Sequence, residues 1–261
     1  MKKINILLAM LSVAAITFTS CKDDKDDTSN SGPAQPGTVT LDLTNVAGTV
    51  NVDETGATSY TNSSGESFTV TKLKYYISNV RLLNADSVVY SLPDGYFLVD
   101  ESNQPSTKLS FPNVPGGAYT SIKFTLGVDS ARNVSGAQTG ALDPANGMFW
   151  TWSSGYIFYK LEGTSTAAPG GITYHIGGFR DANNTNAIRE VEVDFMGSSL
   201  QVDGSREAEI HVLADVLKVF STPNTISIAS INFQMSPGGN ALLIADNYAQ
   251  MFSFDHLHND H

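Results

Sequence analysis

The amino-acid sequence predicts an all-β protein: a single β-sandwich of about ten strands with long loops, immunoglobulin-like in its general architecture. Short runs in which apolar and polar residues alternate recur along the chain, and such alternation is typical of strands that bury one face. Residues that favour turns, namely Gly, Pro and Asn, separate these runs. No stretch shows the periodicity of a long helix, so a fold built from packed sheets is expected.

The expected strands follow from this pattern. They span residues 38–43, 68–82, 88–92, 96–100, 109–111, 121–129, 148–163, 172–176, 188–195, 207–219 and 226–235. For the second half of residues 68–82, a short helical turn is the alternative. Residues 216–220 are expected to curl into a helical turn and residues 241–251 to form a short helix, and residues 252–258 close the chain. Residues 130–147 contain many Gly and Asn residues and form a long loop, and long ordered loops often carry function.

The first twenty residues have the features of a secretory signal peptide. Lys2 and Lys3 precede an apolar run over residues 4–18, which is too short for a membrane-spanning helix. Cys21, the single cysteine of the chain, follows directly, in a position that resembles the lipobox of bacterial lipoproteins. Because an exported chain has little use for one unpaired thiol, we predict lipidation at Cys21. The alternative is a cleavable signal followed by a leftover thiol.

Residues 21–37 are expected to form a flexible acidic tether between the lipid and the domain at residues 38–261. The segment is rich in Asp, Ser, Pro and Gly, and it cannot bury enough apolar surface to fold. Acidic residues directly after the lipidated cysteine resemble a surface-export signal of Gram-negative bacteria. We therefore predict an outer-membrane lipoprotein exposed at the cell surface, with the periplasmic face as the alternative.

The charge balance excludes one large class of partners. The whole chain has a formal net charge of −11, and removing residues 1–20, which contain two lysines and no acids, leaves 13 basic and 26 acidic residues. Such an acidic surface repels phosphate backbones, so nucleic-acid binding is not expected. It is compatible with attraction of cations.

No enzyme is predicted, because the sequence lacks the common catalytic motifs. It contains no glycine-rich phosphate loop, no H-E-x-x-H motif and no G-x-S-x-G motif. The loop before the tryptophans offers Asp143 and Asn146, and Asp129 lies upstream; these oxygen donors would suit calcium. Capped turns are the commoner role for such residues, so calcium is a less favoured cofactor than the metal considered next.

Histidine is the residue type that points to a metal. His256 and His258 are two positions apart in an extended segment, so their imidazoles share one face, about 7 Å apart at the backbone. Imidazole suits copper, zinc and nickel, so the spacing does not name the ion. His175 and His211 are further candidate ligands. His211 shares a strand face with Asp215, and we expect the two side chains to pair. The alternatives are a polar C-terminus without a ligand and a hydrogen-bonded structural histidine at His175.

Both tryptophans of the protein lie near the middle of the chain. Trp150 and Trp152 are two residues apart on an expected strand, so their rings share one face. One interpretation is that both rings fill the core of the sandwich. The other is that one ring borders a functional pocket.

Several motifs resemble, in sequence order, those of the MbnP-like family, which is named after a methanobactin-associated periplasmic protein. They are KYYISNVRL at residues 74–82, VPGGAY at 114–119, FTLGVD at 124–129, LDP at 142–144, MFWTWSSGY at 148–156 and HIGG at 175–178. The M-x-W-x-W-x-x-G-Y run, which ends at Tyr156, is the most distinctive of them. The resemblance covers residues 39–220.

The resemblance implies a β-sandwich that binds copper through histidines, with a tryptophan oxidised to kynurenine by a partner di-haem enzyme of the peroxidase-like type. Carried over to this chain, Trp150 or Trp152 is the modified ring and His175 is the histidine before Gly-Gly. Val134 stands where methane-oxidiser relatives have a histidine. His256 and His258 would compensate if the C-terminus folds back onto the strand of Trp150.

These observations predict an exported lipoprotein that binds a copper ion in metal acquisition or handling. The alternative is a non-metal surface module that recognises a glycan or an outer-membrane protein partner.

Overall fold

The computed structural model describes residues 35–259, except residues 86, 152–153, 181 and 183–184. The predicted signal peptide, Cys21, nearly all of the tether, Trp152 and His261 lie outside the described residues. Within the part that is described, no helix is both long and apolar enough to cross a bilayer.

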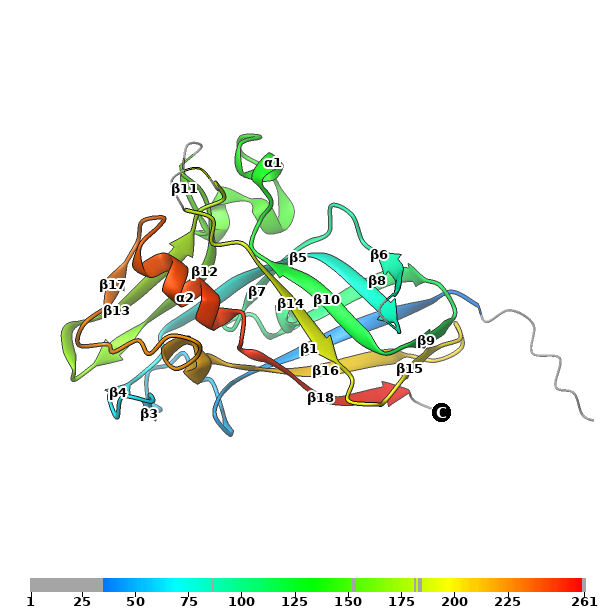
Figure 1. Ribbon diagram of the computed structural model, residues 1–261, viewed down its shortest axis with the longest axis horizontal. Coiled ribbons are helices and arrows are strands. Elements are labelled where there is room, and N and C mark those ends of the chain that lie inside the picture. Colours follow the sequence, from blue (N-terminus) through cyan, green and yellow to red (C-terminus); the bar gives the residue numbers. More distant parts are fainter. Residues whose placement is uncertain (1–34, 86, 152–153, 181, 183–184, 260–261) are drawn as a thin grey trace, which may run out of the picture. The chain divides into compact units, whose positions relative to one another are not determined.

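The described chain is all-β, as the sequence predicts, and most of its strands belong to two sheets. The first sheet has the order β18-β16-β1-β2, with β8 also paired to β1. Its strands are β1 (Gly37–Ala47), β2 (Val50–Asn51), β8 (Lys108–Val114), β16 (Ala208–Asp215) and β18 (Phe252–Asn259). Figure 1 shows β1, β16 and β18 along the lower side of the domain, with β5, β10 and β14 above them.

The second sheet has the path β14-β10-β5-β12-β13-β17, with further short strands attached to it. Its strands are β3 (Tyr60–Thr61), β4 (Ser67–Phe68), β5 (Lys72–Asn84), β6 (Ser87–Ser91), β7 (Tyr96–Asp100), β10 (Ser121–Leu126), β11 (Phe149–Thr151), β12 (Gly155–Ser165), β13 (Ala168–Gly177), β14 (Arg189–Asp194) and β17 (Phe233–Gln234). A separate pair consists of β9 (Gly117–Tyr119) and β15 (Leu200–Val202).

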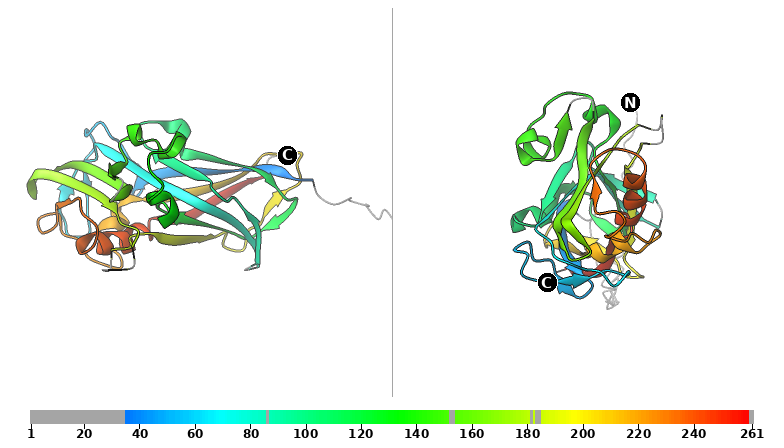
Figure 2. Two further views of the ribbon diagram at one scale, coloured as in Figure 1. Left: turned by 90° about the horizontal axis from the view of Figure 1, so that it is seen from above. Right: turned by 90° about the vertical axis from the view of Figure 1, so that its left-hand side faces the viewer.

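Within residues 35–259, as far as they are described, the helices are few and short. They are α1 (Ser130–Asn133), α2 (Asn240–Tyr248) and the 3-10 turns η1 (Gln104–Thr107), η2 (Gly140–Leu142), η3 (Pro144–Asn146) and η4 (Val216–Phe220). The turn η4 and the helix α2 confirm the helical segments expected near residues 216–220 and 241–251. Helix α2 packs against η4 and β13, on the outside of the strands in Figure 2.

Aromatic side chains join the two sheets in the core. Phe252 of β18 contacts Tyr75 of β5, with ring centroids 5.8 Å apart, and Phe124 of β10, with centroids 5.1 Å apart. Tyr75 in turn stacks on Tyr159 of β12. Burial of such rings is the main source of stability in a chain whose only cysteine, Cys21, lies outside the domain. This packing also fixes the position of β18 against the domain.

One predicted strand is wrong. Of residues 226–235, only Phe233–Gln234 is extended in a sheet. The alternation that suggested a strand arises because Ile226 and Ile228 are both buried. The segment turns here because the Glu66 carboxylate accepts hydrogen bonds from the backbone N–H groups of Ile228 (2.6 Å) and Ala229 (2.9 Å).

The long loop at residues 130–147 is ordered by short helical turns and by one buried amide. Asn133 donates to the carbonyl of Val128 (2.6 Å) and accepts from the backbone N–H of Tyr156 (2.8 Å), which ties the loop to β12. Asp129 caps α1, and Asp143 caps η3 by accepting from Ala145 N–H (2.8 Å). The loop leads into β11, which carries Trp150.

Candidate metal centre

Strand register brings three histidines together on the outer face of the first sheet. Strand β18 pairs antiparallel with β16, so that His256 lies opposite His211 and His258 lies opposite Glu209. Strand β1 pairs parallel with β16 and places Asp42 beside His211. On the other side of β1, strand β8 places Lys108 beside Asp42. A lateral row of four side chains therefore crosses four strands.

Alternation explains why this row faces outward. Ile210 and Val212 of β16 are buried in the core, so His211 between them points to the opposite face. The register of β18 shifts between the partners of His211 and Val212, and Asp255 is the extra residue. This bulge lets His256 and His258 lie on the face that carries His211.

The three imidazoles are close enough to share an ion. The rings of His211 and His256 stack with centroids 4.2 Å apart and planes 7° apart. The His258 ring lies 4.8 Å from each of the other two. One ring nitrogen from each residue lies within 4.8 Å of the others. Parallel rings direct their lone pairs in parallel planes, so coordination of one ion requires one ring to turn. The half-exposed His256 side chain is free of core packing and can do so.

Carboxylates surround the cluster. His211 Nε2 lies 3.2 Å from Glu209 Oε2, and its Nδ1 lies 3.8 Å from Asp42 Oδ2. Asp42, Glu209 and His211 form a second group whose potential ligand atoms lie within 4.8 Å of one another. His256 Nδ1 lies 2.9 Å from Asp255 Oδ2, the arrangement by which carboxylates commonly orient metal-binding histidines.

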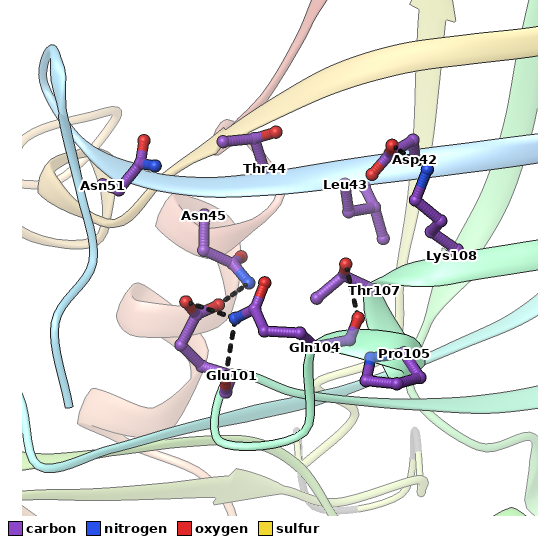
Figure 3. A pocket seen from close by; sticks show the side chains of 10 residues that line it. All are labelled: Asp42, Leu43, Thr44, Asn45, Asn51, Glu101, Gln104, Pro105, Thr107 and Lys108. Carbon is purple, nitrogen blue, oxygen red and sulfur yellow. Dashed lines mark hydrogen bonds and ion pairs between the residues drawn. The ribbon is translucent and has the colours of Figure 1, made fainter.

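Lys108 supplies a positive charge at the edge of this group. Its ammonium lies 2.8 Å from Asp42 Oδ2 and 4.0 Å from Glu209 Oε1. Beside it opens a pocket of about 590 Å³. Figure 3 shows Asp42 and Lys108 together at one end of the lining and Glu101, bonded to Asn45 and Gln104, at the other. The pocket gives solvent a route to the carboxylate side of the cluster.

His175 is not part of the cluster, because it lies on β13 of the second sheet. Its Nε2 lies 2.7 Å from Glu162 Oε1, while its Nδ1 is buried and has no hydrogen-bond partner. Burial lowers the pKa of His175, and the hydrogen bond to Glu162 only partly offsets this effect. The neutral ring then donates to Glu162 from Nε2 and leaves a free lone pair on Nδ1.

Trp150 lies close to the strand of His175. A Cβ placed on Gly177 would come within 3.0 Å of Trp150 Cζ3, so the indole packs on the Gly177 backbone. Gly177 follows His175 by two residues, so Trp150 covers the face of β13 that His175 occupies. The indole Nε1 is buried and has no hydrogen-bond partner. Val134 exposes its side chain.

The remaining candidates have structural roles. Tyr156 is buried, and its hydroxyl donates to the carbonyl of Leu142 (2.8 Å). Asp143 serves as the helix cap described above, the outcome that the sequence favoured over calcium binding. The expected pairing of His211 with Asp215 is wrong: Asp215 accepts from the backbone N–H groups of Gly48 and Leu217 instead.

Asp42, Glu209 and Lys108 were not recognisable as site residues from the sequence. Each belongs to an ordinary alternating strand and carries a charge of the kind expected on any solvated face. Glu209 lies two residues before His211 on the same strand face, but only the pairing of β1 with β16 and with β8, all far apart in sequence, brings Asp42 and Lys108 to this place. A lone charge in a strand gives no sign of such a partner.

Comparison with known proteins gives one family and one solved structure. A family model described as MbnP matches residues 36–240. A search of curated proteins gave no match. The solved structure of MbnP from Methylosinus trichosporium is similar, with a TM-score of 0.48 and 16% sequence identity; the alignment covers 74% of this chain and 80% of that one.

Proposed function

The chain belongs to the MbnP family, and we propose that it binds a copper ion through His211, His256 and His258. The observation that carries this proposal is the convergence of three imidazoles from two paired strands on one solvated face. Nothing in the fold requires three histidines at this place, because the outer face of a sheet is satisfied by any polar side chain. The role is metal acquisition or handling rather than catalysis.

The donor set suits copper. Imidazole nitrogens are good ligands for copper as well as for zinc and nickel, and family membership favours copper among them. Asp255 would hold the Nδ1 proton of His256 and leave Nε2 free to bind the ion. The nearby carboxylates of Asp42 and Glu209 lower the electrostatic cost of bringing a cation to the surface.

Copper titration of the purified full-length protein tests this proposal. Replacing His211, His256 and His258 together by alanine should abolish the binding that the unmodified chain shows in competition with a chromophoric chelator. His175→Ala, on the other sheet, is the matched control and should retain it. Equal affinity in the triple variant would show that the cluster is not the site. A loss only in His175→Ala would move the site to the strand of Trp150.

We further propose that Trp150 is the tryptophan that a partner di-haem enzyme oxidises to kynurenine. Two observations support Trp150: its indole Nε1 makes no hydrogen bond, so none is lost when the ring opens, and its ring covers the strand face of His175. The overall change adds one oxygen and removes one carbon. Intact-mass analysis of protein from the native host tests this modification. Trp150→Phe should remove the modified species, and retention of that species in the variant would exclude Trp150.

For localisation, we propose an outer-membrane lipoprotein anchored at Cys21 and exposed at the cell surface. The signal-like N-terminus and the acidic segment after Cys21 support this. Cys21→Ser should move the protein from the membrane to the soluble fraction. Protease treatment of intact cells distinguishes the surface from the periplasmic face, because only a surface-exposed chain is digested.

The alternative is a non-metal surface module that recognises a glycan or an outer-membrane protein partner, and the pocket in Figure 3 does not favour a glycan. Glycan sites usually present an aromatic ring, and the residues that line the pocket in Figure 3 include none.

A further inference from the structure

The edge of β1 that faces away from β16 is covered by two strands with a break between them. Strand β8 pairs with β1 up to Asp42, and strand β2 pairs with it from Val46. The carbonyl of Asn45 accepts a hydrogen bond from the backbone N–H that follows β2, at 2.9 Å. The break in the edge is therefore at Leu43 and Thr44.

The backbone of Leu43 is open to a ligand in this break. Alternate residues of a strand direct their N–H and C=O groups to the same edge, so Leu43 faces the edge that the Asn45 carbonyl faces. Among the residues that the structure describes, no backbone hydrogen bond joins Leu43 to β8 or to the segment after β2. One donor and one acceptor are available to a group that approaches as a strand would.

The pocket of about 590 Å³ in Figure 3 lies at this break, because Leu43 and Thr44 belong to its lining. Its volume is in the usual range for sites that bind small molecules. Lys108 lies at one end of the lining and Glu101, bonded to Asn45, at the other. A ligand that lies along the break therefore meets an ammonium at one end and a carboxylate at the other.

Glu101 is a partly buried anion without a cationic partner. Its carboxylate accepts hydrogen bonds from Asn45 Nδ2 (2.7 Å) and Gln104 Nε2 (3.1 Å), which are neutral amides. Burial raises the pKa of Glu101, the two amides oppose this effect, and no cation of the described residues adds to theirs. Each carboxylate oxygen has two acceptor positions, so each can take a further hydrogen bond. A ligand ammonium would supply the missing positive charge.

We propose that this pocket binds a short peptide with a free N-terminus, held antiparallel to β1. Both strands that flank the break run antiparallel to β1, so a peptide that continues them has the same direction. This direction places the N-terminal ammonium of the peptide beside Glu101 and its C-terminal carboxylate beside Lys108. The main chain of the peptide bonds to the N–H and C=O groups of Leu43, as in strand addition.

The length of the break sets the length of the peptide. Three steps of about 3.3 Å separate Asp42 from Asn45 along β1, a distance of roughly 10 Å. A peptide of about two or three extended residues matches this distance. Because recognition involves the main chain and both termini, the site accepts peptides of different sequence. The inference is independent of the copper proposal, which concerns the histidines of β16 and β18.

Trialanine is the probe that tests the proposal, in an NMR titration of the full-length protein. It should shift the amide signal of Leu43 and slow the hydrogen exchange of that amide. Leu41, which is already paired with Leu109 of β8, is the control amide and should change little. N-acetyl-trialanine, which has no ammonium, should bind about tenfold more weakly, as expected for a lost hydrogen bond to a charged group. Trialanine amide should lose less, because Lys108 is more than half exposed.

Glu101→Gln is the variant that tests the same contact from the protein side. It should bind trialanine about tenfold more weakly and should no longer distinguish trialanine from its acetylated form. Glu192→Gln, at an ion pair on the second sheet, is the matched control and should bind as the unmodified chain does. If Glu101→Gln does not fold, the comparison of the two peptides on the unmodified chain still decides.

Two results would overturn the inference: trialanine leaves Leu43 unshifted, or the acetylated peptide binds as tightly as trialanine. The variant that lacks His211, His256 and His258 should bind trialanine normally. Loss of the peptide in that variant would place it at the histidine cluster and would also overturn the inference. Each of these results leaves the copper titration to be judged by itself.

Discussion

The ring of His211 stacks on the ring of His256, with centroids 4.2 Å apart and planes 7° apart, because β16 and β18 place these residues directly opposite each other. The two histidines are supplied by strands that are separated by the whole of α2 and its flanking loops. Their contact therefore depends on the docking of β18 onto the domain, and that docking depends in turn on the burial of Met251 and on the ring contacts of Phe252. The histidine cluster and the packing of the C-terminal strand are therefore one structural feature.

Asp255→Asn should weaken copper binding by about tenfold, the lower end of the range for a carboxylate behind a ligand histidine. The carboxylate, 2.9 Å from His256 Nδ1, holds the proton on that nitrogen and keeps Nε2 free for the ion. An amide accepts this proton less strongly. Chelator competition measures the effect, and the thermal midpoint should not move because Asp255 is exposed.

Asp94→Asn is the control for that measurement. Asp94 is an exposed acid that pairs with Arg132. If both variants lose the same affinity, the effect of Asp255 is only a change in net charge, and its role in orienting His256 is refuted.

The sequence predicts the part of the candidate site that lies within one strand. The spacing of His256 and His258 predicts a shared face, and the structure places them so. It was not sufficient for the partners, because the alternation of residues 38–43 and 207–215 is compatible with many pairings. The parallel pairing of β1 with β16 is a property of the whole fold.

The same distinction explains what the sequence predicted of the fold. Strands with regular alternation, such as Ser121–Leu126, were recognised because one face is buried. The segment around Ile226 and Ile228 has the same alternation, yet it turns because Glu66, far away in sequence, satisfies its backbone N–H groups. An alternating pattern shows which residues are buried, whereas hydrogen bonds from residues far away in sequence determine whether the segment forms a strand or a turn.

Gly177→Ala should displace Trp150 and destabilise the domain by about 2 kcal/mol, as overpacking of a filled site does. The added Cβ would lie 2.4 Å from the carbonyl oxygen of Tyr156 and 3.0 Å from Trp150 Cζ3. Urea denaturation gives the free energy of unfolding, and the tryptophan emission maximum should shift. Gly170→Ala on the same strand is the control, because its nearest neighbour is 3.8 Å away. Similar behaviour of the two variants would contradict the packing of Trp150 on β13.

Asn133→Ala should lower the free energy of unfolding by about 2–3 kcal/mol, because the Tyr156 N–H is left without its partner next to a buried ring. The variant also loses the bond to the Val128 carbonyl, so the loop before Trp150 loosens. Ser135→Ala, in the same loop but exposed, should have little effect. Urea denaturation compares the two, and an unfolding free energy equal to that of the unmodified chain would show that the loop is held by other contacts.

Glu66→Gln should destabilise the domain at neutral pH and should do so less as the solution becomes acidic. Although partial burial acts in the opposite direction, hydrogen bonds from Asn62, Ala229, Ile228 and Ser227 lower the pKa of Glu66 to about 2. Because the folded pKa is below the ordinary value of 4.5, the charged form stabilises the folded state above pH 4.5. This contribution is lost as the pH falls toward 2.

We expect a loss of about 2 kcal/mol at pH 7 in Glu66→Gln, the magnitude usual for hydrogen bonds to a charged group. The difference from the unmodified chain should shrink steadily between pH 4.5 and pH 2, measured by urea denaturation at each pH. Glu192→Gln, at an exposed ion pair with Lys123, should differ from the unmodified chain by less than about 1 kcal/mol. A difference between Glu66→Gln and the unmodified chain that stays constant from pH 7 to pH 2 would contradict this account. It would mean that the charge of the Glu66 carboxylate does not stabilise the turn at residues 227–229, because a charged acceptor loses its stronger hydrogen bonds when it is protonated.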